Sequence, residues 1–98
     1  MNESEVMARL RHELLNAMYN SYPQPLDRTR LASDCRTPFL TRDKDWYHHA
    51  VIEQLKILDN AGLVRPFHGG YTLTEKGRRD RQQVARFMNK AGTPPEAA

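Results

Sequence analysis

The chain has 98 residues, of which 39% are hydrophobic and 28% are charged, and its formal net charge is +3. This composition is typical of a globular chain rather than a disordered one, and the length suits a single domain. The apolar runs are only a few residues long, so the sequence predicts no membrane span. The acidic, polar start does not resemble a signal peptide, and a single cysteine suits a reducing compartment. We therefore expect a cytoplasmic protein.

Two helices are predicted in the first third of the chain. Apolar residues recur at helical spacing over residues 4–19, and Ser4 is the expected N-cap. The apolar stripe consists of Val6, Leu10, Leu14, Ala17 and Met18. Asp27 is the expected N-cap of a short second helix over residues 28–35, which would bury Leu31 and Ala32.

A third, longer helix is predicted after a connection in which Phe39 and Leu40 are expected to reach the core. It begins near Thr41 or Asp43, since both residue types cap helices well. Its core stripe consists of Tyr47, Val51, Leu55 and Leu58. Gly62 ends the helix, because the residue after a helix often adopts the left-handed conformation.

A hairpin and a last helix are predicted in the remaining third. Residues 63–67 and 71–74 read as two short strands joined by the turn His68-Gly69-Gly70. Thr74 is the expected N-cap of a helix over residues 75–90. The apolar stripe of this helix consists of Val84, Phe87, Met88 and Ala91.

Two motifs in this part of the chain resemble signatures of the winged helix-turn-helix superfamily. Residues 55–64, LKILDNAGLV, look like the L-x-x-L-x-x-A-G-L-[IV] end of the recognition helix in small bacterial and phage regulators. Residues 71–77, YTLTEKG, look like the Y-x-L-T-x-x-G signature that closes the wing. The resemblance covers residues 7–87. It implies an α+β, mostly helical winged helix-turn-helix fold over residues 1–91, with a flexible tail over 92–98.

The resemblance also implies a function and a set of contacts. In this superfamily the third helix enters the major groove and the wing lies on the flanking backbone. The residues that this places on double-stranded DNA are Arg42, Lys44, His48, His49, Ile52, Glu53, Lys56, Arg65 and His68. Arg42 and Lys44 suit phosphate or guanine contacts, whereas the carboxylate of Glu53 repels phosphates. The implied protein is a transcriptional regulator.

Other interpretations of these residues stay open. The third helix has nearly balanced charge, so its outer face could simply be solvated. With Trp46, Ile52, Ile57 and Phe67 nearby, it could instead bind another protein. The densest basic run could be a stripe facing phosphates or a solvated helix face; it consists of Lys76, Arg78, Arg79, Arg81 and Arg86.

The remaining expectations concern assembly and chemistry. The apolar stripes of the first and last helices favour a homodimer. The metal-ligating side chains are scattered, so we expect no metal and no cofactor; they are His12, Cys35, His48, His49 and His68. No phosphate-binding glycine loop and no set of acid, base and nucleophile can be assembled, so we expect no enzymatic activity.

Overall fold

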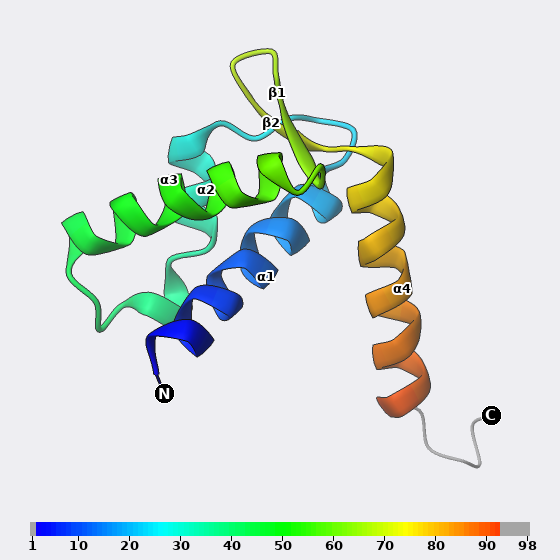
Figure 1. Cartoon of the computed structure of the whole chain (residues 1–98), viewed down its shortest axis with the longest axis horizontal. Coiled ribbons are helices and arrows are strands. Elements are labelled where there is room, and N and C mark those ends of the chain that lie inside the picture. The colour runs from blue at the N-terminus through cyan, green and yellow to red at the C-terminus, as the bar shows by residue number, and fades with distance from the viewer. Residues whose placement is uncertain (1, 93–98) are drawn as a thin grey trace.

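The computed structural model describes residues 2–92, with the side chains of residues 2–87. This part of the chain contains four α-helices, a short 3₁₀ turn and a two-stranded antiparallel sheet (Figure 1). The order is α1 (Glu3–Ser21), α2 (Arg28–Asp34), η1 (Thr37–Phe39), α3 (Lys44–Asn60), β1 (Val64–Phe67), β2 (Gly70–Leu73) and α4 (Glu75–Gly92). The fold is a small, mostly helical α+β domain, and the predicted order of helices and hairpin is confirmed.

Side-chain caps set the starts of the first three α-helices. The prediction of Ser4 as a cap is wrong, because Asn2 is extended and its side chain accepts from the backbone N–H three residues on, at 2.8 Å. Asp27 and Asp43 cap α2 and α3 in the same way, at 2.7 and 3.1 Å. Each cap satisfies a backbone donor that the helix itself leaves free.

The hydrophobic core joins α1, α2 and α3 with the base of the hairpin. The predicted stripe of α3 is buried throughout, whereas in α1 Leu15 is buried in place of the half-exposed Ala17. The expectation for the connection is half right. Phe39 is 3% exposed and stacks on Tyr47 with ring centroids 5.8 Å apart, but Leu40 is 66% exposed. The single turn η1 turns Phe39 inward and leaves the next side chain in solvent.

The hairpin is tighter than predicted. Its strands pair from Val64 with Leu73 to Phe67 with Gly70, so only His68 and Gly69 form the loop. Both have positive φ, 48° and 79°, as a type I′ turn requires. The first strand therefore begins one residue later than predicted and ends as predicted, and the second strand lies one residue earlier at both ends.

The residue before α2 fixes the hairpin to the body of the domain. Leu26 and Tyr71 exchange two backbone hydrogen bonds, of 3.0 and 2.8 Å. Gly70 lies so close to this segment that a Cβ atom there would sit 2.7 Å from the Leu26 carbonyl oxygen. Any side chain at this position would push the hairpin away from the start of α2.

The ends of the two sequence motifs lie against each other. Gly62 has a φ of 76° and ends α3 as predicted. The hydroxyl of Thr74 donates to the Gly62 carbonyl oxygen at 2.5 Å and accepts from the Gly77 N–H at 3.1 Å, so its predicted capping role is confirmed. Gly77 packs directly on the backbone of Leu63. These contacts fix the start of α4 to the end of α3.

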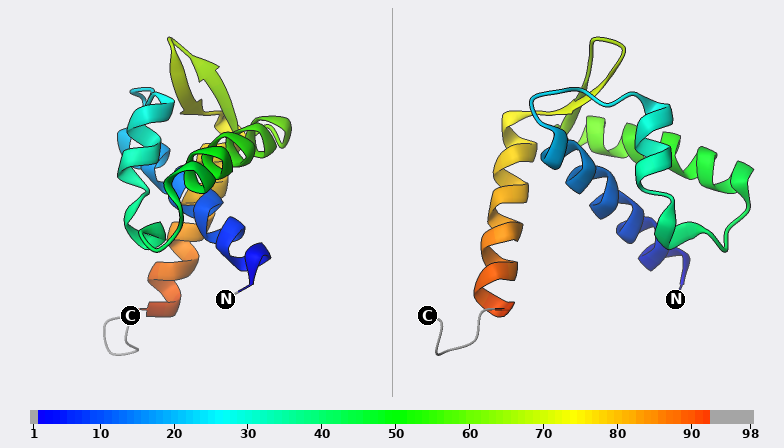
Figure 2. Two further views of the ribbon diagram at one scale, coloured as in Figure 1. Left: turned by 90° about the vertical axis from the view of Figure 1, so that its left-hand side faces the viewer. Right: turned by 180° about the vertical axis from the view of Figure 1, so that it is seen from behind.

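Only the first half of α4 packs on the domain. Figures 1 and 2 show its second half extending away from the other helices. Phe87, a member of the predicted apolar stripe, is 70% exposed and does not pack within the domain. Met88 and Ala91 lie beyond the described side chains, and the predicted tail lies outside the described residues except for Gly92, which ends α4. No helix in residues 2–92 is long and apolar enough to cross a membrane.

Candidate nucleic-acid interface

The helices α2 and α3 lie side by side with the hairpin above them (Figure 2, left view). Three of the predicted contact residues, Lys44, His48 and Ile52, recur every four residues on α3, so they share the edge of the helix that faces α2. Lys44 and His48 are exposed, and Ile52 is half-buried. The structure thus brings together the predicted residues on this edge of α3.

Between the two helices run two adjoining hollows, of about 320 and 210 Å³. Both contain Thr29, Ala32 and His48, so they form one groove, which we call the α2–α3 groove. Its complete lining is Arg28, Thr29, Ala32, Ser33, Arg36, Lys44, Tyr47, His48, Val51 and Ile52. No carboxylate is part of this lining, which leaves the groove with only cationic and neutral side chains.

The cations of the groove are not neutralised by acids. None of the ion pairs within residues 2–87 involves Arg28, Arg36 or Lys44. Arg36 is half-buried, with its guanidinium 4.6 Å from the centre of the Tyr47 ring. Its Nη2 donates to the Arg42 carbonyl oxygen at 3.0 Å, and its Nη1 has no hydrogen-bond partner.

Sequence reasoning missed the contribution of α2 to this groove. Thr29, Ala32, Ser33 and Arg36 are spaced i, i+3, i+4 and i+7, which places them on one side of α2 and its C-terminal extension. That spacing was available as a signal. It was not informative without α3, because a seven-residue helix with mixed polar residues has no obvious functional face.

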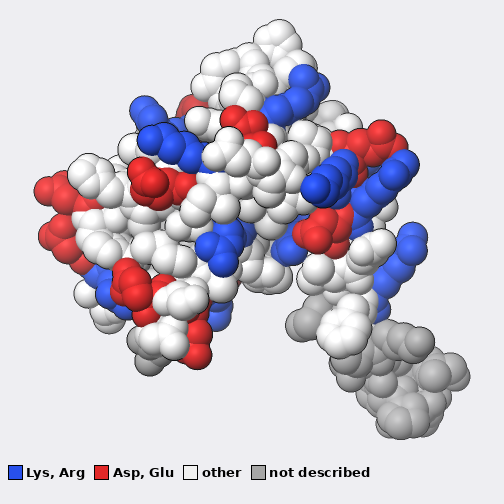
Figure 3. Space-filling model, viewed as in Figure 1, with Lys and Arg blue, Asp and Glu red and all other residues white. Residues whose placement is uncertain are grey.

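The other predicted contact residues on α3, and Arg42 just before it, lie outside the groove. Arg42 pairs with Glu3 at 3.5 Å and lies over the ring of Trp46, 4.8 Å from its centroid. Glu53 and Lys56 form an exposed pair at 3.7 Å, and His49 is exposed. Acidic and basic side chains alternate over the face shown in Figure 3. The outer face of α3 is therefore close to neutral.

The hairpin carries little charge. The guanidinium of Arg65 lies 4.8 Å from the centre of the Phe67 ring, and the ring of His68 lies 4.1 Å from the same ring. Its tip is otherwise uncharged in Figure 3. The two predicted hairpin residues are close together, and Phe67 gives their cluster an apolar centre.

The basic run of α4 is largely engaged within the domain. Arg79 pairs with Glu75 at 2.6 Å, and the Lys76 ammonium donates to the Ala61 carbonyl oxygen at 2.9 Å. Arg78 lies over the Tyr22 ring at 4.4 Å. This arrangement does not form a stripe of free cations facing one direction.

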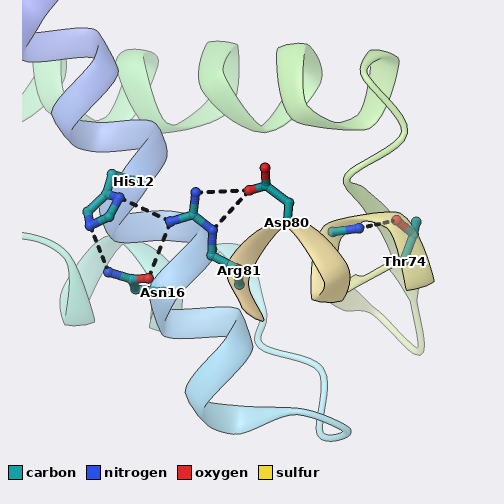
Figure 4. Close-up of polar contacts among 6 residues, drawn as sticks. His12, Asn16, Thr74, Asp80 and Arg81 are labelled. Atoms are coloured by element: carbon teal, nitrogen blue, oxygen red, sulfur yellow. Dashed lines mark hydrogen bonds and ion pairs between the residues drawn. The ribbon is translucent and has the colours of Figure 1, made fainter. Parts of the chain in front are cut away.

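Arg81 anchors α4 to α1 (Figure 4). It is 8% exposed, and its guanidinium donates to Asp80 at 2.9 and 3.1 Å. A third nitrogen lies 3.0 Å from His12 Nδ1 and 3.4 Å from Asn16 Oδ1, both on α1. An arginine this deeply buried needs such partners, since an unpaired buried charge is strongly destabilising.

Two buried weak acids, Tyr47 in the wall of the groove and Cys35 outside its lining, serve packing. The Tyr47 hydroxyl donates to the Ala32 carbonyl oxygen at 2.5 Å, and burial raises its pKa well above the ordinary value. Cys35 is 1% exposed, and burial, with smaller contributions from Glu13 and Asp34, raises the pKa of its thiol to about 12. Both therefore stay protonated at neutral pH. Within the described residues, no three His, Cys, Asp or Glu side chains cluster as metal ligands.

No protein-family model, curated protein or solved structure matches this chain.

Proposed function

We propose that this chain is a winged-helix protein that binds double-stranded DNA and regulates transcription. In this proposal α3 enters the major groove and the hairpin is the wing on the flanking backbone. The observation that carries it is the α2–α3 groove, where Arg28, Arg36 and Lys44 have no acidic partner in the described part of the chain. Free cations beside an exposed helix are what a phosphate backbone attracts.

The attachment of the hairpin supports the proposal. The backbone pair between Leu26 and Tyr71 holds the hairpin beside the start of α2, and the hydrogen bond of 3.0 Å from the Leu63 N–H to the Leu58 carbonyl oxygen holds its base against α3. The groove, α3 and the hairpin are thus joined by short backbone contacts. A surface built in this way can meet a duplex without first ordering itself.

A gel shift on mixed duplex fragments at low and moderate salt tests the proposal. We expect binding that weakens steeply with salt, because each phosphate contact releases counterions. Lys44→Ala should weaken binding about tenfold by removing a free cation. Arg42→Ala should matter less, since Glu3 already pairs with Arg42, and Ile52→Ala should leave affinity almost unchanged. No shift with micromolar protein at low salt refutes the function.

The second candidate is a protein-interaction module on the same scaffold. Exposed apolar side chains favour it: Leu40 is 66% exposed and Ile57 is 46% exposed, and the Glu53–Lys56 pair keeps α3 nearly neutral. A protein partner would depend on apolar contacts and tolerate salt. Loss of binding in Ile52→Ala or Ile57→Ala, with little effect of Lys44→Ala, would support this candidate over DNA.

We also propose that the protein acts as a homodimer through the projecting half of α4. That half leaves the domain with Phe87 70% exposed, and a second copy could cover it (Figure 1). Light scattering after size exclusion should give twice the mass of one chain. Phe87→Glu should give the monomer mass without loss of the folded core, because this side chain makes no core contact.

A further inference from the structure

We propose that the α2–α3 groove is a seat for a phosphate group. The ligand chemistry is a tetrahedral phosphate anion, supplied by a nucleic-acid backbone or by free phosphate. A site for a backbone phosphate rests on the proposed function, whereas a site for free phosphate does not. In the larger hollow Arg36 and Lys44 supply the charge, and the hydroxyls of Thr29 and Ser33 supply neutral donors. Arg28 lines the adjoining smaller hollow.

The first argument is the balance of charge around the groove. Three cations line it, and no carboxylate does. Other surface hollows of the described residues carry acids: Glu75 and Asp80 beside α4, Glu13 and Asp34 between α1 and α2, and Asp80 between α1 and α3. An anion would be repelled by those carboxylates, whereas in the α2–α3 groove it meets only positive and neutral groups.

The second argument is the convergence of donors from two helices. Thr29 and Ser33 are four residues apart on α2, and Lys44 and His48 are four apart on α3. Side chains at this spacing lie one above the other on the same helix face. The two pairs therefore line opposite walls of one hollow of about 320 Å³, which is large enough for a phosphate and its contacts.

The third argument is the way Arg36 is held. Its guanidinium stacks over the Tyr47 ring, and one nitrogen is fixed by the Arg42 carbonyl oxygen. Tyr47 is itself fixed by its hydrogen bond to Ala32. The planar fork is thus oriented before any ligand arrives, and its Nη1 has no partner. Arginine forks of this kind recognise phosphate through two parallel hydrogen bonds.

Inorganic phosphate is the probe for the first test. The ¹⁵N-labelled protein is titrated with phosphate against chloride at constant ionic strength and pH, and amide shifts are followed. We expect saturable shifts confined to residues 28–36 and 44–48. Lys44→Gln should weaken binding about fivefold, and Arg36→Lys should also weaken it although the charge is kept.

The matched control is Lys56→Gln, which removes an exposed lysine from the same helix outside the groove and should leave phosphate affinity unchanged. Lys44 and Ser33 are exposed, so Lys44→Gln and Ser33→Ala report on the groove even if Arg36→Lys disturbs the stack on Tyr47. Shifts that do not saturate, or that Lys56→Gln reduces as much as Lys44→Gln does, would overturn the phosphate seat.

Duplex DNA is the probe for the second test. If the seated phosphate belongs to a backbone, Lys44→Gln should lower the slope of affinity against salt by about one, and inorganic phosphate should compete. Saturable phosphate shifts without duplex binding would keep the seat as a free-phosphate site and refute the DNA function. If the duplex binds, the slope of affinity against salt is unchanged in Lys44→Gln and phosphate causes no amide shifts, the DNA function is kept and the phosphate site is refuted.

Discussion

The α2–α3 groove and the basic run of α4 carry similar charge, but their cations have different partners. In α4, Lys76, Arg78 and Arg79 are engaged by a carbonyl, a ring and a carboxylate, and Arg81 is buried in a polar network. In the groove none of Arg28, Arg36 and Lys44 has an acidic partner among the described residues, although Arg36 is held by a ring and a carbonyl, so the exposed Arg28 and Lys44 carry most of the contrast. The density of charge in a sequence therefore does not give the charge available to a ligand; the folded partners decide it.

The contrast has a local cause. Glu75 is four residues before Arg79, and Asp80 is adjacent to Arg81, so α4 supplies its own counter-charges. On α2 the comparable pair is Arg30 with Asp34, which lies away from the groove. The groove side of α2 has hydroxyls instead.

The first prediction concerns the junction that fixes α4. Gly77→Ala should lower the free energy of unfolding by about 3 kcal/mol, because its Cβ would overlap the Leu63 carbonyl oxygen. Urea unfolding measures the loss. Gln83→Ala, an exposed change on the same helix, should alter stability by less than about 0.5 kcal/mol. A loss below about 1 kcal/mol for Gly77→Ala would mean that α4 is not fixed by this contact.

The second prediction separates a buried cation from an exposed one. Arg81→Met should lower the free energy of unfolding by about 2 kcal/mol, since Asp80 and His12 lose their shared donor. Arg79→Met should change it by less than about 0.5 kcal/mol, because its pair with Glu75 is exposed. Thermal and urea unfolding measure both variants. If Arg81→Met and Arg79→Met lost the same free energy of unfolding, the distinction between the two arginines would be contradicted.

The third prediction uses the thiol that ends α2. Burial raises the pKa of Cys35 from 9.0 to about 12. The contribution of the protonated thiol to the free energy of unfolding is therefore fully present below pH 9 and is lost as the pH rises toward 12. The unfolded chain loses the proton first, so stability should fall by up to about 1.4 kcal/mol per pH unit in this range.

Urea unfolding at pH 8, 9 and 10 measures this slope. Cys35→Ala should flatten it, although the smaller side chain lowers stability at every pH. The slope of Arg81→Met should match that of the unmodified protein, because an arginine does not titrate in this range. If the free energy of unfolding of Cys35→Ala fell with pH as steeply as that of the unmodified protein, the loss of stability at alkaline pH would belong to other groups, such as Tyr47.

The fourth prediction concerns duplex affinity, where the expected change for the α4 cations is the smallest. Arg78→Gln combined with Arg79→Gln should change duplex affinity by less than about twofold at low salt, because both cations already have partners on the domain. The charge-matched pair Arg28→Gln and Lys44→Gln should weaken it more than about tenfold. Fluorescence anisotropy with one labelled duplex compares the two. Equal losses would show that total charge, and not its availability, governs binding.

Much of the fold could be predicted from local patterns. The stripe of Tyr47, Val51, Leu55 and Leu58 recurs with the period of a helix, and its burial follows from that period alone. Gly62 and Thr74 act where backbone geometry or a free donor demands their residue type. The errors lie where two local solutions compete. Asn2 and Ser4 can both cap a helix, and a single 3₁₀ turn decides that Phe39 is buried and Leu40 is not.

The sequence by itself determined the order of the elements, most of the core and the caps, because each depends on residues a few positions apart. Only the tertiary structure decided which cations are free and that α2 and α3 enclose a groove without carboxylates. The reason is physical: a residue's charge is a local property, but its partners and its burial depend on segments that folding brings together. The predicted contacts Arg42 and Lys44 stand two residues apart, yet Arg42 pairs with Glu3 while Lys44 lines the groove.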